Sequence, residues 1–286
     1  MSALKHALRS GRIVRLRRGV YAEASAAEHL STAVTLTVPR AVVSDRSAAL
    51  QHGLPVVGGL PTDVEITVPP RASTNIAGAH PYRARLRPQD IVQIDDRPVT
   101  SPARTVVDVA RHWPWRTSVP AIDAALFGGL TSLEEIADVL HFCAGWPGIG
   151  RAKRAVALSD GRAESPLESI SRLVIPRLGF PRPEPQRWIL DQYGRPIARC
   201  DFSWDELGVV GEADGRGKYG QADAYPLEKE RQERLEDLGL VVVRWGWRHA
   251  WSQHEILRRK IGNGVQRALL RDRSGFPRLW TLGPST

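Results

Sequence analysis

The chain has 286 residues and a net charge of +9, with 42% hydrophobic and 25% charged residues, as in ordinary soluble globular proteins. Its two cysteines, Cys143 and Cys200, exclude a disulfide framework and a cysteine-based zinc site, and no apolar run reaches the roughly 20 residues of a membrane span. We therefore expect a cytoplasmic protein without membrane contacts or a small-molecule cofactor, whose positive charge favours DNA or another nucleic acid as its partner.

Residues 1–30 predict a short helix followed by a basic hairpin. The apolar residues over 4–8 have helical spacing, and the hairpin over 12–21 turns near Gly19. A helix followed by such a hairpin is the second half of a winged helix, so we predict a partial winged-helix domain here. The arginines that would contact DNA phosphates, or would otherwise simply be solvated, are Arg12, Arg15, Arg17 and Arg18.

Residues 31–160 predict a small middle domain that contains both helices and strands. Its predicted elements are, in chain order, a helix at 44–53, strands at 64–68 and 82–86, a helix that starts within 100–110, and helices at 121–126, 133–140 and 151–158. His52, His80 and Asp108 are scattered through this segment. We therefore expect each of them to be a surface or capping residue rather than a ligand.

Residues 163–286 predict a C-terminal α/β domain with a mixed sheet. Its predicted elements are a helix from Ser165 that Pro176 shortens, strands at 197–203 and 209–214, a polar loop at 215–226, a helix at 227–238 and a buried strand at 240–245. Together the three segments predict a multi-domain α+β protein.

Three carboxylates lie on the two adjacent strands of this third segment. Because side chains alternate along a strand, Glu212 and Asp214 point to one face, and Asp201 shares a face with Arg199 and Ser203. A carboxylate within an apolar strand is costly unless it is paired or binds a metal. The strands could therefore bring three acids to one spot, where hard oxygen ligands suit Mg²⁺ or Mn²⁺. The alternative is a set of salt-bridged residues at the edge of the sheet.

Several short motifs occur in order along the third segment. They are Ser165–Ser169, Arg199–Trp204, Val210–Gly215, Lys218–Tyr219, Glu228–Arg231 and Val242–Trp245. In these stretches the segment resembles the very-short-patch-repair-like branch of the PD-(D/E)XK nuclease superfamily. The resemblance implies a restriction-endonuclease-like fold and metal-dependent hydrolysis of DNA phosphodiester bonds.

The same resemblance implies a set of site residues. Asp201 and Glu212 would ligate the metal, with Asp214 as a supporting or second ligand. Glu168 matches the acidic residue of the leading helix. It also stands three residues after Ser165, where it would form a capping box, and the two roles are compatible.

The resemblance also shows one departure. A lysine normally lies two residues after the second acid and helps to position the attacking water, but here Asp214 occupies that position. Lys218 or Lys229 would then supply the lysine. On the helix of Lys229, Arg231 and Arg234 are candidates for DNA contacts, and the alternative for these cations is a solvated helix face.

The first two segments resemble the AbiEi-type antitoxin family of abortive-infection (type IV toxin–antitoxin) systems. Residues 11–21 match the wing of its winged helix, and Arg104, Thr105 and Asp108 within 100–110 match its middle motif. The resemblance implies a DNA-binding antitoxin with a cognate toxin as a partner. A full winged helix has two helices before the wing helix, and only residues 1–10 precede the hairpin.

The sequence thus leads to two hypotheses about function. The first is a DNA-binding protein whose C-terminal domain is a metal-dependent endonuclease. The second is a non-catalytic transcriptional regulator or antitoxin, whose nuclease-like fold only binds DNA or a partner protein. An RNA substrate is also open, because nothing in the sequence recognises or excludes a 2′-hydroxyl.

Overall fold

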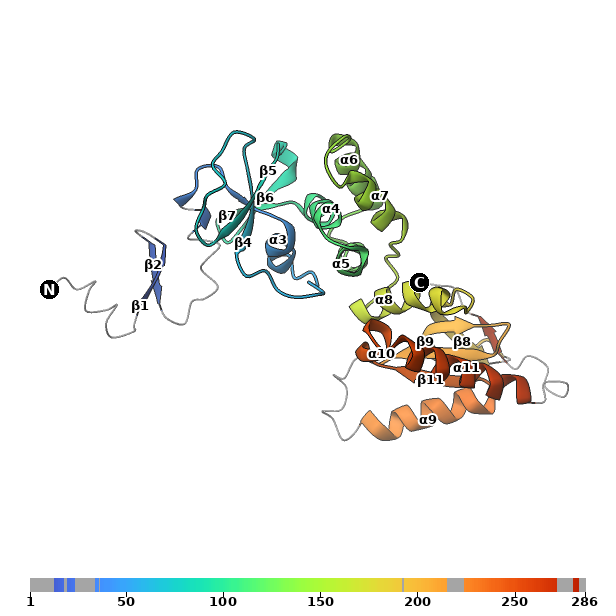
Figure 1. Ribbon diagram of the computed structural model, residues 1–286. Coiled ribbons are helices and arrows are strands. Elements are labelled where there is room, and N and C mark those ends of the chain that lie inside the picture. Colours follow the sequence, from blue (N-terminus) through green and yellow to red (C-terminus); the bar gives the residue numbers. More distant parts are fainter. Residues whose placement is uncertain are drawn as a thin grey trace. The chain divides into compact units, whose positions relative to one another are not determined.

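The structure, a computed structural model, shows an α+β protein and confirms that part of the prediction. It describes residues 13–17, 20–23, 34–35, 37–191, 193–214, 224–271 and 280–282. The chain divides into two compact units, residues 1–157 (unit 1) and 158–286 (unit 2), and each contains a mixed five-stranded sheet (Figure 1). Within the described ranges, no helix is long and apolar enough to cross a membrane.

Unit 1 begins with the predicted basic hairpin. Strands β1 (Ile13–Arg17) and β2 (Val20–Glu23) pair antiparallel. Arg15 and Arg17 lie on β1, whereas Arg12, Arg18 and the helix predicted over 4–8 lie outside the described residues.

The rest of unit 1, as far as the structure describes it, consists of a sheet and the helices α3 to α7 (Figure 1). Its elements are β3 (Val42–Val43), α3 (Asp45–Gln51), β4 (Val64–Val68), β5 (Ala79–Arg83), the 3₁₀ turn η2 (Pro88–Asp90), β6 (Ile91–Ile94), β7 (Arg97–Thr100), α4 (Pro102–His112), α5 (Trp115–Phe127), α6 (Leu133–Phe142) and α7 (Ile149–Ala157). The strand order is β5-β4-β3-β7-β6, with parallel and antiparallel pairs.

One strand of this sheet is displaced from its predicted position. The alternation over 82–86 predicted a strand there, but β5 covers Ala79–Arg83. β5 pairs parallel with β4, from Val64 opposite Ala79 to Val68 opposite Arg83. The bounds of β5 therefore follow from where β4 begins and ends. The sequence of β5 itself carries no information about those positions.

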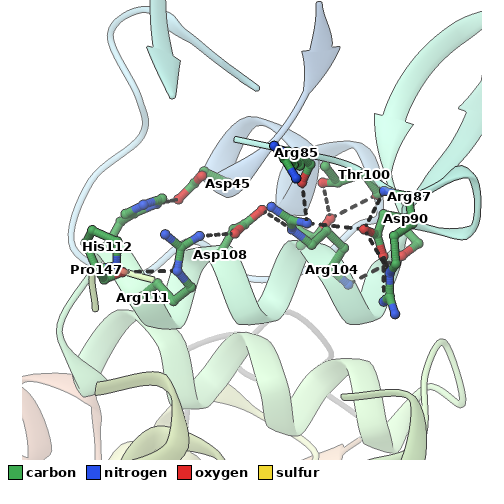
Figure 2. A network of polar contacts seen from close by, with 12 residues as sticks. Asp45, Arg85, Arg87, Asp90, Thr100, Arg104, Asp108, Arg111, His112 and Pro147 are labelled. Carbon is green, nitrogen blue, oxygen red and sulfur yellow. Dashed lines mark hydrogen bonds and ion pairs between the residues drawn. The ribbon is translucent and has the colours of Figure 1, made fainter. Parts of the chain in front are cut away.

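Asp108 on α4 was expected to be a surface or capping residue, and this expectation was wrong. It is 1% exposed, with Oδ2 2.7 Å from Arg104 Nε and Oδ1 2.7 Å from Arg111 Nη1 (Figure 2). The expectation failed because other segments cover the polar face of α4. Arg104 also donates to the carbonyl of Arg85, and Arg111 donates to that of Pro147.

The same network continues from α4 to η2. Arg104 Nη1 lies 3.2 Å from Asp90 Oδ2, and Arg87 Nη2 lies 2.9 Å from Asp90 Oδ1 (Figure 2). The side chains of Arg104 and Asp90 are 0% and 1% exposed. Removing one partner of such a buried pair leaves an uncompensated charge, so the network holds α4 and η2 together.

His52 and His80 occupy capping and surface positions, as the sequence predicted. His52 directly follows the last residue of α3, and its Nε2 lies 2.7 Å from the carbonyl oxygen of Thr100. His80 is exposed on β5.

A buried Asp–His pair joins the start of α3 to the end of α4. Asp45 is fully buried, and its Oδ1 lies 2.8 Å from His112 Nδ1 (Figure 2). Asp45 has φ of +50°, a left-handed conformation that few non-glycine residues adopt. Burial raises the pKa of Asp45 to about 6, although the hydrogen bond and charge of His112 oppose that rise.

Unit 2 is built around the predicted mixed sheet, with strand order β11-β10-β9-β8-β12 (Figure 1). Its elements are α8 (Pro166–Val174), the 3₁₀ turn η3 (Ile175–Leu178), β8 (Glu184–Asp191), β9 (Pro196–Trp204), β10 (Val209–Ala213), α9 (Ala224–Asp237), β11 (Val241–Trp245), α10 (Trp247–Trp251), α11 (His254–Leu270) and β12 (Trp280–Leu282). Strands β8 and β12 and helices α10 and α11 were not predicted from the sequence. As expected, α8 ends just before Pro176.

Helices pack on both faces of this sheet. Leu235 of α9 packs in one core cluster with Cys200 and Val210. Gly211, the next residue on β10, points to the other face, where the Trp245 ring lies against it. Trp245 Nε1 donates to Ser171 Oγ of α8 at 2.8 Å, so α8 covers that second face.

Gly211 leaves the room that Trp245 occupies. A Cβ at position 211 would lie 2.5 Å from the Trp245 ring. We expect Gly211→Ala to lower the free energy of unfolding by about 1–3 kcal/mol, as overpacking of a core does. Gly262→Ala on α11 is the matched control, because its Cβ would meet an ordinary contact at 3.9 Å. Urea unfolding should show the control unchanged or up to about 1 kcal/mol more stable; equal loss in both would contradict the prediction.

The Asp45 pKa predicts a pH dependence of stability. An unfolded aspartate titrates near 4, so the folded state holds an extra proton between about pH 4 and pH 6. The contribution of Asp45 to stability is therefore present below pH 4 and is lost as the pH rises through 6. Asp45→Asn removes the titration, and asparagine tolerates the left-handed backbone.

Melting temperatures measured from pH 4 to pH 8 check this prediction. Relative to Asp45→Asn, the wild type should lose stability between pH 4 and 6 and then level off. Asp95→Asn is the control, because Asp95 is also left-handed (φ +48°) but exposed. Parallel curves for wild type and Asp45→Asn would contradict the shifted pKa.

Candidate functional site

Glu168 lies in the first turn of α8 and its carboxylate is fully hydrogen-bonded. Its backbone N donates to Ser165 Oγ at 3.2 Å, and Ser165 Oγ donates to Glu168 Oε1 at 2.7 Å. Its Oε2 accepts from the backbone N of Glu164 at 3.0 Å and from Gln186 Nε2 at 2.7 Å. The predicted capping role is thus present, and Glu168 also binds a residue of β8.

Gln186 is a site residue that the sequence analysis missed. It is 2% exposed and has φ of +53° within β8, which is rare for a residue with a side chain. Strained conformations of this kind cluster at functional sites, where the surrounding structure maintains them. A signal was present in the sequence, because Gln186 is an uncharged polar residue shortly before the apolar residues Trp188 and Ile189 of β8.

Asp201 and Glu212 come from the adjacent strands β9 and β10. These strands pair antiparallel, with Val210 opposite Ser203 and Gly211 opposite Phe202. The paired stretch ends at Gly211 and Phe202, one residue before Glu212 on β10 and one residue after Asp201 on β9. Asp201 Oδ2 accepts a hydrogen bond from the backbone N of Ala213 at 2.8 Å, beside Glu212.

Glu212 is held by two arginines. Its Oε2 accepts from Arg244 Nε at 2.7 Å, and its Oε1 accepts from Arg231 Nη2. Its side chain is only 9% exposed. Arg231, a predicted DNA contact, has its guanidinium bonded to this carboxylate. Arg244 was not singled out in the sequence, although it stands directly opposite Glu212 in the parallel β10–β11 register.

Further contacts connect Arg231 to β9 and the start of α8. Arg231 Nη1 donates to the carbonyl of Arg199 at 3.3 Å, and Arg199 forms an ion pair with Glu164. A chain of polar contacts therefore runs from Glu212 to the residue just before the Ser165 cap. The ion-paired residues of this chain are separated by several elements in sequence, which is why local patterns did not reveal them.

The remaining predicted site residues are not part of the contacts around Glu212 described above. Asp214 is half-buried, and its backbone N donates to the carbonyl of Trp245 at 2.9 Å. Arg234 is exposed on α9. Lys229 belongs to α9, but its side chain lies outside the described residues, as does all of Lys218.

The thiol of Cys200 reports on the charge around the two acids. Burial raises the pKa of Cys200 to about 12, and the negative charge of Glu212 and then that of Asp201 add to the rise, while Arg231 opposes it. Both carboxylates therefore act on the same buried point. The thiol stays protonated at neutral pH, so Cys200 is not a nucleophile.

The donor set of this site is chemically suited to a hard cation, because Asp201 and Glu212 offer carboxylate oxygens. Asp201 is half-buried, whereas both oxygens of Glu212 are engaged by Arg231 and Arg244. In the part of the chain that the structure describes, no three His, Cys, Asp or Glu side chains form a group that could hold a metal. A cation bound by both acids would therefore require Arg231 or Arg244 to release Glu212.

Comparison with known proteins gives relatives but no family. No family model matches the chain. Two curated proteins of Mycobacterium tuberculosis, "Uncharacterized protein MT2308" and "Uncharacterized protein Rv2248", are each 31% identical to it over 151 residues, or 53% of this chain. The chain spans 55% of each relative, about half of their length.

The paired arginines predict that Glu212 supports the fold of unit 2. Glu212→Gln would leave Arg231 and Arg244 without their carboxylate, so we expect a loss of about 1–3 kcal/mol in unfolding free energy. The control is Glu255→Gln on α11, where the side chain is 84% exposed and its contact with Arg258 is 3.6 Å long. Denaturant unfolding should leave the control within about 0.5 kcal/mol of wild type. A Glu212→Gln protein as stable as that control would show that the arginine pairs carry no net stability.

Proposed function

We propose that unit 2 is a nuclease domain that hydrolyses DNA phosphodiester bonds with Mg²⁺ or Mn²⁺ held by Asp201 and Glu212. The observation that carries the proposal is the geometry of these two acids on adjacent antiparallel strands, with Asp201 bonded to the backbone N of Ala213. The resemblance to the very-short-patch-repair-like nucleases supports the same assignment, with Asp214 as a supporting ligand and Glu168 as the acid of the leading helix.

Each residue of the site would have a stated role. A bound divalent cation would lower the pKa of a water ligand and neutralise charge on the phosphate. The Ala213 N–H orients the Asp201 carboxylate, and Gln186 fixes Glu168 to β8. Arg231 would leave Glu212 and offer its guanidinium to a DNA phosphate, which it can bind in bidentate fashion. Lys218 or Lys229 would assist the attacking water.

The N-terminal part of the chain would bring this domain to DNA. The net charge of +9 favours a polyanion, and Arg15 and Arg17 lie on the first strand of a hairpin. We assign that hairpin, with Arg12 and Arg18, as the wing of a partial winged helix. The AbiEi-type resemblance supports this assignment.

A second function is favoured by one specific observation. Both oxygens of Glu212 are bonded to arginines, which is the expected state of a structural ion pair rather than of an available metal ligand. Under this alternative the protein is a non-catalytic regulator or antitoxin that binds DNA, with a cognate toxin as a partner. Its nuclease-like unit would then serve only as a binding surface.

A cleavage assay on the full chain separates the two functions. Wild type, Asp201→Asn, Glu212→Gln and the exposed control Glu255→Gln would be incubated with Mg²⁺, Mn²⁺ or EDTA. The substrates would be single-stranded, duplex, mismatched and branched DNA, and RNA. We expect wild type and control to cleave only with the metal, and Asp201→Asn to lose about 10- to 100-fold or more of that activity, as loss of metal-site groups does. Circular dichroism would verify that each variant is folded.

Two outcomes would contradict the proposed nuclease activity. Cleavage that is equal in wild type and Asp201→Asn would come from another site or a contaminant. No cleavage by any protein, with equal DNA binding by all four, would favour the regulator. Mn²⁺ titration by calorimetry supplies an independent readout, because only the nuclease predicts binding that Asp201→Asn weakens.

A further inference from the structure

Unit 1 contains a cavity of about 480 Å³ that the proposed nuclease does not use. Its walls come from β4 and β5, the end of α4 and the start of α7. A volume in this range is typical of small-molecule sites, which span about 300–1,000 Å³. Its lining includes Arg46, Tyr82, Arg111, His112, Trp113 and Arg151.

His112 is held in a fixed orientation beside this cavity. Its Nδ1 lies 2.8 Å from Asp45 Oδ1 (Figure 2), and its ring stacks on Tyr82 with centroids 4.2 Å apart and planes 6° apart. Nε2 lies on the far edge of the ring from Nδ1, so it points away from Asp45. A carboxylate on one ring nitrogen fixes the orientation of the imidazole and leaves the other nitrogen for a ligand.

Two arginines stand next to His112 on the same wall. Arg111 precedes it on α4, and Arg151 of α7 donates from Nη1 to the His112 carbonyl oxygen at 3.0 Å. The start of α7 is packed tightly on the end of α4, because a Cβ at Gly148 would lie 2.2 Å from the carbonyl oxygen of Arg111. This packing fixes the distance between the two helix ends that carry the donors.

Arg111 is already ion-paired with Asp108, with Nη1 2.7 Å from Oδ1, so the positive charge offered to an anion comes mainly from Arg151. Glu65 is neutralised by Arg46, whose Nη2 and Nε lie 2.6 and 3.0 Å from its Oε1. Asp63 is an exposed carboxylate on the wall, and it is the group that an anion must avoid. Arg151 makes its hydrogen bond to a backbone carbonyl rather than to a carboxylate, so its charge remains available.

Buried polar atoms that lack hydrogen-bond partners gather behind this wall. Among the described residues, Asp45 Oδ2 and Ser44 Oγ have none, although both residues are 0% exposed. Trp113, which lines the cavity, also has a buried Nε1 without a partner. Native proteins rarely retain such atoms, and each one calls for an explanation such as a functional role.

We propose that this cavity binds the phosphate group of a nucleotide-sized anion. Arg111, His112 and Arg151 form the phosphate-binding wall, since several donors on one side suit an anion with three accessible oxygens. The rings of Tyr82 and His80, whose centroids are 4.8 Å apart, flank the organic part of the ligand. The phosphate belongs either to a free nucleotide or to the 5′ end of a nucleic-acid strand. This site is independent of whether unit 2 cleaves DNA.

Isothermal titration calorimetry on the full chain, without divalent cations, tests the proposal. The probes are adenosine 5′-monophosphate, adenosine, inorganic phosphate, and a short single-stranded oligonucleotide with or without a 5′-phosphate. Arg151→Ala and its matched control Arg154→Ala both remove an exposed arginine from α7, and only Arg151 lines the cavity. Because both are exposed, neither change should impair folding.

We expect the mononucleotide to bind and adenosine not to bind. Arg151→Ala should weaken that binding at least tenfold, while Arg154→Ala leaves it unchanged, and His112→Asn should also weaken it. Arg151-dependent binding that is tightest for the 5′-phosphorylated oligonucleotide would identify a strand end as the source, and tightest binding of the mononucleotide would identify a free nucleotide. Equal binding of adenosine, equal loss in the two arginine variants, or no binding of any phosphate would overturn the proposal.

Discussion

The pairing of buried carboxylates with cations is the interaction on which both units depend. A carboxylate removed from water without a partner is so costly that it would be neutralised or the fold would not form. In unit 1, Asp108 binds Arg104 and Arg111 within α4, and Arg104 also binds Asp90 of η2. In unit 2, Glu212 binds Arg231 and Arg244 and connects β10 to α9 and β11. The Arg104–Asp90 pair and the two pairs of Glu212 join elements that are separate in the sequence.

These pairs explain why the site was only partly predictable. Asp201 and Glu212 could be found because each interrupts an apolar strand, and a charge in such a place always needs a partner. Their partners could not be found in the same way. Arg231 and Arg244 reach Glu212 from elements that lie 19 and 32 residues away, and only the register of β10 with β11 and the packing of α9 bring them there.

The fold shows the same division between local and long-range information. Helix α4 was predictable because Ser101 caps it and Pro102 occupies its first turn, signals that lie within a few residues. The bounds of β5 could not be predicted, because they follow from its pairing with β4. The burial of Asp108 was missed for a related reason. Its spacing from Arg104 and Arg111 was visible in the sequence, but the segments that cover that face of α4 were not.

The arginines around Glu212 also bear on the choice between the two functions. A guanidinium and a divalent cation compete for the same carboxylate oxygens, so the ion pairs set an energetic cost for metal binding. That cost is moderate for Arg231, whose side chain is 34% exposed and can be solvated when it leaves. An exchange of this kind would couple metal binding to the presence of a phosphate, because the released guanidinium needs a new anion. A purely structural pair would have no such coupling.

Backbone strain gives an independent indication of where function lies. Five described non-glycine residues have positive φ, and three of them, Arg40, Asp95 and Asp96, are exposed, where turns adopt this conformation at little cost. Asp45 and Gln186 differ, because both are buried and each costs about 1–3 kcal/mol. Asp45 orients His112 at the cavity of unit 1, and Gln186 binds Glu168 in unit 2. A less strained residue at either position would fold more easily but would lose that hydrogen bond, so the strain is best explained by the group that each residue positions.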